Sequence, residues 1–114
     1  MHLRSLAIAS LFVLAQPATA VLVSAAEEPV FVIEMADGVL TPSRLEVPAG
    51  KAFKLEVTNA GATPAEFESK TLRKEKVIAP KAKASFAIKA LAAGEYDFFD
   101  EHQPKAAPGV IVAK

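Results

Sequence analysis

The sequence contains no cysteine and no tryptophan, and neither charge prevails: Lys and Arg total 13, as do Asp and Glu, in 114 residues. Without cysteine the chain can form no disulfide, no thiolate nucleophile, no cysteine-based zinc or iron–sulfur site, and no copper site that needs a thiolate. The balanced charge does not favour a nucleic-acid-binding protein, which would carry a basic stripe. Hydrophobic residues make up 52% of the chain, which excludes a disordered one, and the length fits a single domain.

The beginning of the chain has the layout of a secretory signal peptide. Arg4 supplies a positive charge, an apolar run follows, and Pro17 precedes small residues. We expect cleavage after Ala26 or after Ala20. In the first case residues 1–26 form the signal peptide. The apolar run is shorter than the ~20 residues of a membrane-spanning helix, although an uncleaved anchor is the alternative. We therefore expect the remaining residues to form one exported, periplasmic domain without stable membrane insertion.

The segment 27–114 reads as short strands separated by glycine, proline and asparagine turns. Alternating apolar and polar residues at 53–58, for example, are typical of a half-buried strand. Strand signals recur every ~8–12 residues, which favours an all-β fold, an antiparallel Greek-key β-sandwich of about seven or eight strands. The expected strands cover 31–35, 44–47, 53–58, 65–68, 77–78, 85–89, 94–100 and 109–112.

The expected strand 94–100 carries a fold signal and an anomaly. A glycine two residues before Tyr96 resembles the tyrosine corner of Greek-key sandwiches, in which the phenol hydroxyl bonds back to the backbone. Alternation places Tyr96 and Asp100 on the core face, where an unpaired carboxylate is costly. Glu101 and His102 follow at once, so these three polar residues form a candidate metal-ligand cluster. The alternative is a solvated loop in which Asp100 bonds loop amides.

Glu66 and Glu68 form a second candidate. They share one face of the expected strand 65–68, separated by ~7 Å, while the residue between them faces inward. Two such carboxylates could chelate a hard or borderline cation. The alternative is a solvent face on which they pair with lysines such as Lys54 or Lys89.

Three further features carry weaker functional signals. Met35 could ligate Cu(I) but is also explained by packing. The basic stretch 70–76 is expected to be a solvated loop that could also dock an acidic partner. No Ser-His-Asp arrangement and no phosphate-binding loop appear in the sequence. The chain is therefore not expected to be an enzyme, although it could assist iron oxidation.

Five segments carry a resemblance to a known family. Residues 45–51, 55–59, 64–68, 78–80 and 94–98 resemble the cupredoxin-like domains of exported bacterial proteins. The chain is most similar to the cupredoxin-like subunits of ferrous-iron uptake systems, akin to EfeO-type proteins. This resemblance implies a cupredoxin sandwich that acts in the periplasm beside a high-affinity iron permease.

The sequence departs from the cupredoxin copper-ligand pattern. The family places a histidine where this chain has Ala65, a cysteine where it has Asp100, and a methionine where it has Ala107. Only the second histidine of the pattern is retained, as His102. The resemblance therefore implies no type-1 blue-copper site.

The same resemblance implies a carboxylate site in its place. EfeO-type domains are similar in having Glu-aromatic-Glu where this chain has Glu66 and Glu68. The implied site joins these two residues to Asp100, Glu101 and His102, a donor set that suits Fe(II), Fe(III) or Cu(II). Strict alternation points both glutamates away from the core face, so a bulge would be needed to bring them to Asp100.

Two classes of function follow from these expectations. The first is a periplasmic metal-binding protein, with iron or copper as the ion, that serves ferrous-iron uptake beside a permease or other subunits. The alternative is a metal-free cupredoxin-fold module for protein–protein interaction, since a fold does not fix a function. A copper-binding electron-transfer protein is a third possibility, which the missing cysteine disfavours.

Overall fold

The computed structural model describes residues 12–17 and 28–114. The expected cleavage positions, after Ala20 and after Ala26, and the start of the expected signal peptide lie outside the described residues. Within the described ranges, no helix has the length and apolar character needed to cross a membrane.

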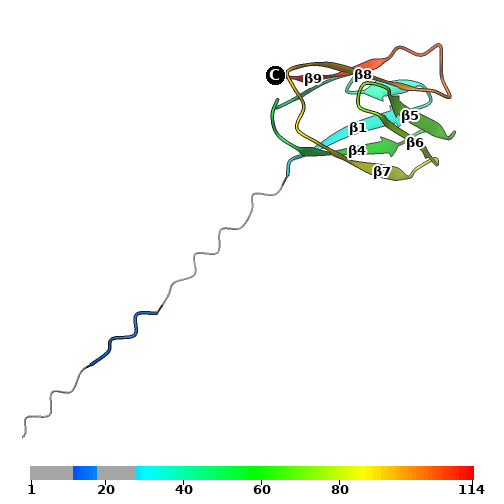
Figure 1. Cartoon of the computed structure of the whole chain (residues 1–114). Helices are drawn as coiled ribbons and strands as arrows, with labels where there is room; N and C mark the ends of the chain where they lie inside the picture. Colours follow the sequence, from blue (N-terminus) through cyan, green and yellow to red (C-terminus); the bar gives the residue numbers. More distant parts are fainter. Residues whose placement is uncertain (1–11, 18–27) are drawn as a thin grey trace, which may run out of the picture.

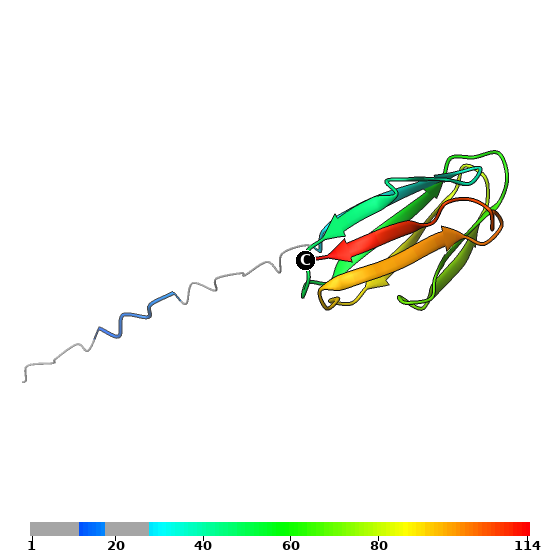
Figure 2. The same ribbon diagram turned by 90° about the horizontal axis from the view of Figure 1, so that it is seen from above.

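In the described residues, nine strands form two sheets that pack face to face (Figure 1). The four-stranded sheet has the order β2-β1-β4-β7, and the five-stranded sheet has the order β3-β9-β8-β5-β6. Figure 2 shows β9 between β3 and β8. The strands are β1 (Val30–Ala36), β2 (Val39–Thr41), β3 (Arg44–Val47), β4 (Phe53–Asn59), β5 (Ala65–Ser69), β6 (Lys74–Ile78), β7 (Lys83–Ile88), β8 (Gly94–Asp100) and β9 (Gly109–Ala113).

The expected all-β sandwich is confirmed, with two differences in its strands. β2 is an additional strand of three residues, which forms a hairpin with β1 across Asp37 and Gly38. Both sheets are mixed, because β1 pairs with β4 in parallel and β3 pairs with β9 in parallel. The chain reaches this arrangement by leaving the four-stranded sheet after β2 and entering the five-stranded sheet as β3.

One local expectation is wrong. The stretch 70–76 is not a loop throughout, because β6 begins at Lys74 and pairs with β5 along its whole length. The alternation of Lys74, Glu75 and Lys76 shows no apolar period, which is why the sequence pattern does not reveal a strand. Charged side chains of this kind are common on the outermost strand of a sheet, where they discourage pairing with other chains.

The core lies between the sheets and is filled by inward-facing residues of both. The ring of Phe67 packs against Phe98, with centroids 5.6 Å apart, and against Phe86, with centroids 5.2 Å apart. Met35 is fully buried in the same cluster, so it serves packing rather than metal ligation. Aromatic rings in contact contribute ~0.5–1.5 kcal/mol per pair beyond their buried area.

The tyrosine corner is confirmed. The hydroxyl of Tyr96 donates a hydrogen bond of 2.8 Å to the backbone carbonyl of Ala92, four residues upstream. This bond ties the start of β8 to the connection that brings the chain over from β7. The far end of β8 lies beside β5, where Asp100 is opposite Phe67.

Candidate metal site

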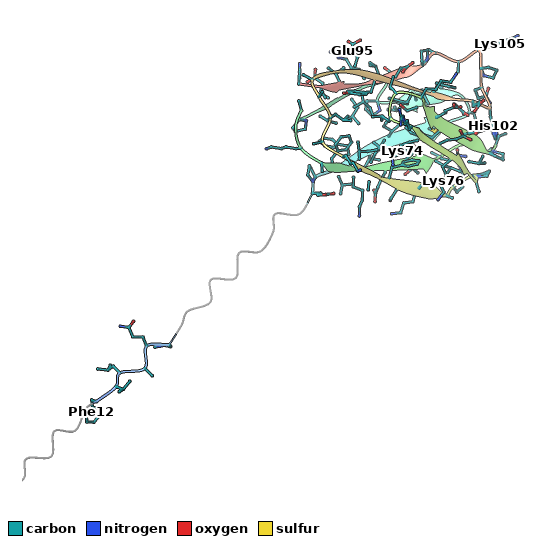
Figure 3. The ribbon with its side chains drawn as sticks, in the orientation of Figure 1. Phe12, Lys74, Lys76, Glu95, His102 and Lys105 are labelled. Carbon is teal, nitrogen blue, oxygen red and sulfur yellow. The ribbon has the colours of Figure 1, made fainter. Side chains whose placement is uncertain are left out.

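The candidate residues gather where β5 and β8 lie side by side, at the end of the sandwich opposite the C-terminus (Figures 1 and 3). The register of this pair sets Phe67 opposite Asp100, and both side chains face the core. Their neighbours therefore face outward: Glu66 on β5 and Glu101 in the turn just beyond β8. The amide of Glu101 donates a hydrogen bond of 2.9 Å to the carbonyl of Glu66, which continues the pairing beyond β8.

Three carboxylates meet on this outer face. Glu66, Glu68 and Glu101 each offer an oxygen, and these oxygens all lie within 4.8 Å of one another. Glu66 and Glu68 are half-buried, and Glu101 is exposed. No bulge is needed for this grouping, because ordinary alternation turns Glu101 outward directly after Asp100 turns inward.

His102 lies beside this group and has a defined orientation. Its Nδ1 is 3.1 Å from the carbonyl oxygen of Pro64, and its Nε2 is 3.2 Å from a carboxylate oxygen of Glu66. A carbonyl oxygen can only accept, so Nδ1 carries the proton. Nε2 therefore pairs with Glu66 when the ring is charged, and it offers a lone pair to a metal ion when the ring is neutral. Histidines that bind metals are held in this manner through their other ring nitrogen.

Asp100 has a different environment from the other candidates. It is buried, with 3% of its surface exposed, and its Oδ1 accepts hydrogen bonds from the amides of Glu66 at 2.9 Å and His102 at 3.0 Å. The side chain thus joins the two segments that carry the candidate ligands. The structure gives Asp100 the amide-bonding role weighed in the sequence analysis, and its role as a ligand stays a prediction.

Burial and neighbouring carboxylates raise the pKa of Glu66 and of Glu68. A hydrogen bond with Glu101, then burial, and then the negative charges of Glu101 and Glu75 raise the pKa of Glu68 to about 7, and Lys70 opposes this shift. Burial, followed by the charges of Glu101 and Glu75, also raises the pKa of Glu66. A cation placed among these oxygens would relieve the same repulsion.

The side chain of Glu68 also fits a bound cation. Its Oε2 is buried and has no hydrogen-bond partner within the described part of the chain. A buried carboxylate oxygen without a partner is costly, and an ion would satisfy it. The all-oxygen group suits a hard or borderline ion, and the adjacent imidazole widens the range to Cu(II).

Glu75 lies on the same surface, but the sequence analysis did not predict it as part of the site. It lies directly opposite Glu68 in the β5–β6 pairing. Only a predicted strand at 74–78 could have placed Glu75 beside Glu68, and the charged residues of this segment show no apolar period that predicts a strand. The lysines expected to neutralise the glutamates do not do so, because Lys54 lies on β4 and Lys89 follows β7, both in the other sheet.

Comparisons with known proteins agree with this architecture. The sequence profile of the cupredoxin-like domain matches residues 4–113. The chain therefore belongs to the cupredoxin-like domain family. An uncharacterized protein of Rickettsia prowazekii (strain Madrid E) is 31% identical over 80 residues, which are 70% of this chain and 64% of that protein. The chain thus spans slightly less than two thirds of the length of this curated relative.

Solved structures with the same fold include copper proteins. Reduced auracyanin from the photosynthetic bacterium Roseiflexus castenholzii superimposes with a TM-score of 0.62 at 14% identity, over 79% of this chain and 99% of that one. A Cu(I) amicyanin mutant gives 0.58 at 18% identity, over 75% and 82%. A heme-copper terminal oxidase gives 0.62 at 12% identity, over 76% and 65%. At these identities the likeness describes the fold alone.

The residues present do not fit a type-1 copper centre. Such a centre needs a cysteine thiolate, and the chain has none. The end of β8 instead carries Asp100, whose Oδ1 is occupied by two backbone amides. A blue-copper electron-transfer site is therefore excluded for this chain.

Asp100→Asn should retain most of the stability of the protein, because the amide oxygen of asparagine can accept the same two hydrogen bonds. Asp100→Val should lower the free energy of unfolding by about 2–4 kcal/mol, because two partly buried amides then lose their acceptor. Urea denaturation of both variants measures the difference. Equal destabilisation by the two substitutions would contradict the assigned role of the two hydrogen bonds.

The pKa of Glu68 makes a second prediction, which concerns pH. Folding raises this pKa from 4.5 to about 7. Between these two pH values the folded state therefore keeps a proton on Glu68 that the unfolded state has released. The contribution of this proton to stability is present at low pH and is lost as the pH rises through about 7. The melting temperature of the metal-free protein should therefore rise as the pH falls from about 8 to about 5. Calorimetry should show a smaller rise in Glu68→Gln, and an unchanged rise would contradict the assignment.

Proposed function

We propose that this cupredoxin-like protein binds a metal ion, iron in the first place and copper as the alternative, at Glu66, Glu68, Glu101 and His102. The observation that carries this proposal is the convergence of three carboxylates, two on β5 and one just beyond β8, within 4.8 Å of one another. Negatively charged side chains avoid such proximity unless a proton or a cation compensates for it. The partnerless Oε2 of Glu68 supports a cation in particular.

The donor set favours iron over copper. Carboxylate oxygens prefer hard ions, and a single imidazole beside them still suits Fe(II). The ion would be cargo that the protein captures and releases, since the site opens on the outer face of the sheet. Asp100 would hold the two ligand-bearing segments in register through its two amide hydrogen bonds.

We further propose that the protein acts in the periplasm as a component of a ferrous-iron uptake system. Support comes from the signal-peptide layout of residues 1–26 and from the resemblance to EfeO-type domains, which function beside an iron permease. Membership of the cupredoxin-like domain family agrees with this assignment. The permease, or another subunit of the system, is the proposed partner that receives the iron.

Anaerobic calorimetric titration of the chelator-treated protein with Fe(II), and in parallel with Cu(II) and Zn(II), tests the metal site. We expect one ion per chain, and Glu68→Gln and His102→Ala should each weaken binding at least about tenfold. Glu34→Gln is the matched control, because Glu34 is an exposed glutamate on β1, in the other sheet. Absence of binding by every ion, or equal affinity in all three variants, would refute the metal site.

The role in uptake has its own test. Deleting the gene should lower the accumulation of radioactive iron in iron-limited cells supplied with Fe(II). The gene for the wild-type protein should restore uptake, and so should the gene for the Glu34→Gln variant. Failure of the Glu68→Gln gene to restore uptake would tie transport to the site. Normal uptake in the deletion strain would refute this role while leaving metal binding intact.

A further inference from the structure

A small groove lies on the side of the molecule where both sheets end. It is bounded by the tip of the β5–β6 hairpin and by the connection from β7 to β8, with a cavity volume of about 200 Å³. Leu72, Ile88 and Leu91 provide apolar walls, and Lys74 and Lys89 stand among them. A cavity of this size is smaller than the ~300–1,000 Å³ of ligand pockets and is suited to a single apolar side chain.

The groove lies between two free strand edges. Within the described residues, β6 pairs only with β5, and β7 pairs only with β4. Their outer backbone N–H and C=O groups are therefore available to an added strand. A peptide can use such groups, whereas a lipid or a small anion cannot reproduce their spacing along six residues of β7.

The surroundings of the groove are basic. Two lysines line it, Lys74 from the β5–β6 hairpin and Lys89 from the opposite side. In the described part of the chain neither of these two lysines takes part in an ion pair. Figure 3 shows Lys74 and Lys76 along β6. Unpaired cations around an apolar cavity are complementary to a segment that carries carboxylates on both sides of one apolar residue.

We propose that this groove docks an extended, acidic segment of a partner protein. One apolar side chain of the segment enters between Leu72, Ile88 and Leu91. Its flanking carboxylates pair with Lys74 and Lys89, and its backbone continues the four-stranded sheet beyond β7. This docking does not use the proposed metal ligands, because none of the four lines the groove, although Lys74 also borders the hollow that contains Glu68 and Glu75.

Titration of the isotopically labelled protein with a synthetic peptide tests this docking by nuclear magnetic resonance. The peptide alternates glutamate with valine and has leucine at its centre, and a lysine-for-glutamate peptide is its control. We expect amide shift changes at Leu72, at Lys74 and along β7. The double variant Lys74→Glu, Lys89→Glu should weaken binding at least about tenfold. The matched variant Lys105→Glu, Lys114→Glu should leave the affinity unchanged. Lys105 and Lys114 are exposed lysines before and after β9, which is separated from β6 by two strands of the same sheet.

Several outcomes would overturn the proposal. Equal weakening in both double variants, or equal binding of the lysine peptide, would show only general charge attraction. No shift change at about 1 mM peptide would show that the groove does not accept such a segment. Binding of phosphatidylglycerol vesicles without peptide binding would replace the peptide by a lipid surface. A dimer in sedimentation that Lys74→Glu, Lys89→Glu abolishes, without peptide binding, would replace it by a second copy of the chain.

Discussion

The carboxylate of Asp100 holds together the part of the molecule on which the candidate site depends. Its Oδ1 accepts from an amide on β5 and from an amide just beyond β8, so two segments more than thirty residues apart share one acceptor. The bond geometry leaves little freedom for either segment to slide. Since the side chains on a strand alternate, a slip of one residue would send Glu66 and Glu68 into the core and Phe67 into solvent. The position of every proposed ligand follows from this register.

Local alternation predicted much of this arrangement. The strand 94–100 was expected to turn Tyr96 and Asp100 inward, and it does; the glutamates around Phe67 were expected to face outward together, and they do. These predictions succeed because the alternation of side chains along a strand is a local property. Burial of an aromatic ring is strongly favourable, so it fixes which face of the strand points inward and turns the adjacent residues outward. The amide bonds of Asp100 were also foreseen, as an alternative to ligation.

What the sequence could not supply is which strands lie side by side. Glu75 joins the carboxylates only because β6 pairs with β5, and its own segment shows no apolar period. β2 has three residues, too few for a pattern to emerge. The parallel pairing of β1 with β4 depends on the chain changing sheets between them. Pairing partners are set by tertiary packing, which no short window of sequence records.

Because the carboxylates of the candidate site point outward, they contribute little to the packing that stabilises the fold. Glu66, Glu68 and Glu101 project from the sheet, while the aromatic core behind them is complete without them. Substitutions at such positions cost little folding free energy, since they remove no packed apolar group. A lineage with this scaffold can therefore exchange these outward side chains one at a time, passing through intermediates that still fold, without rebuilding the domain.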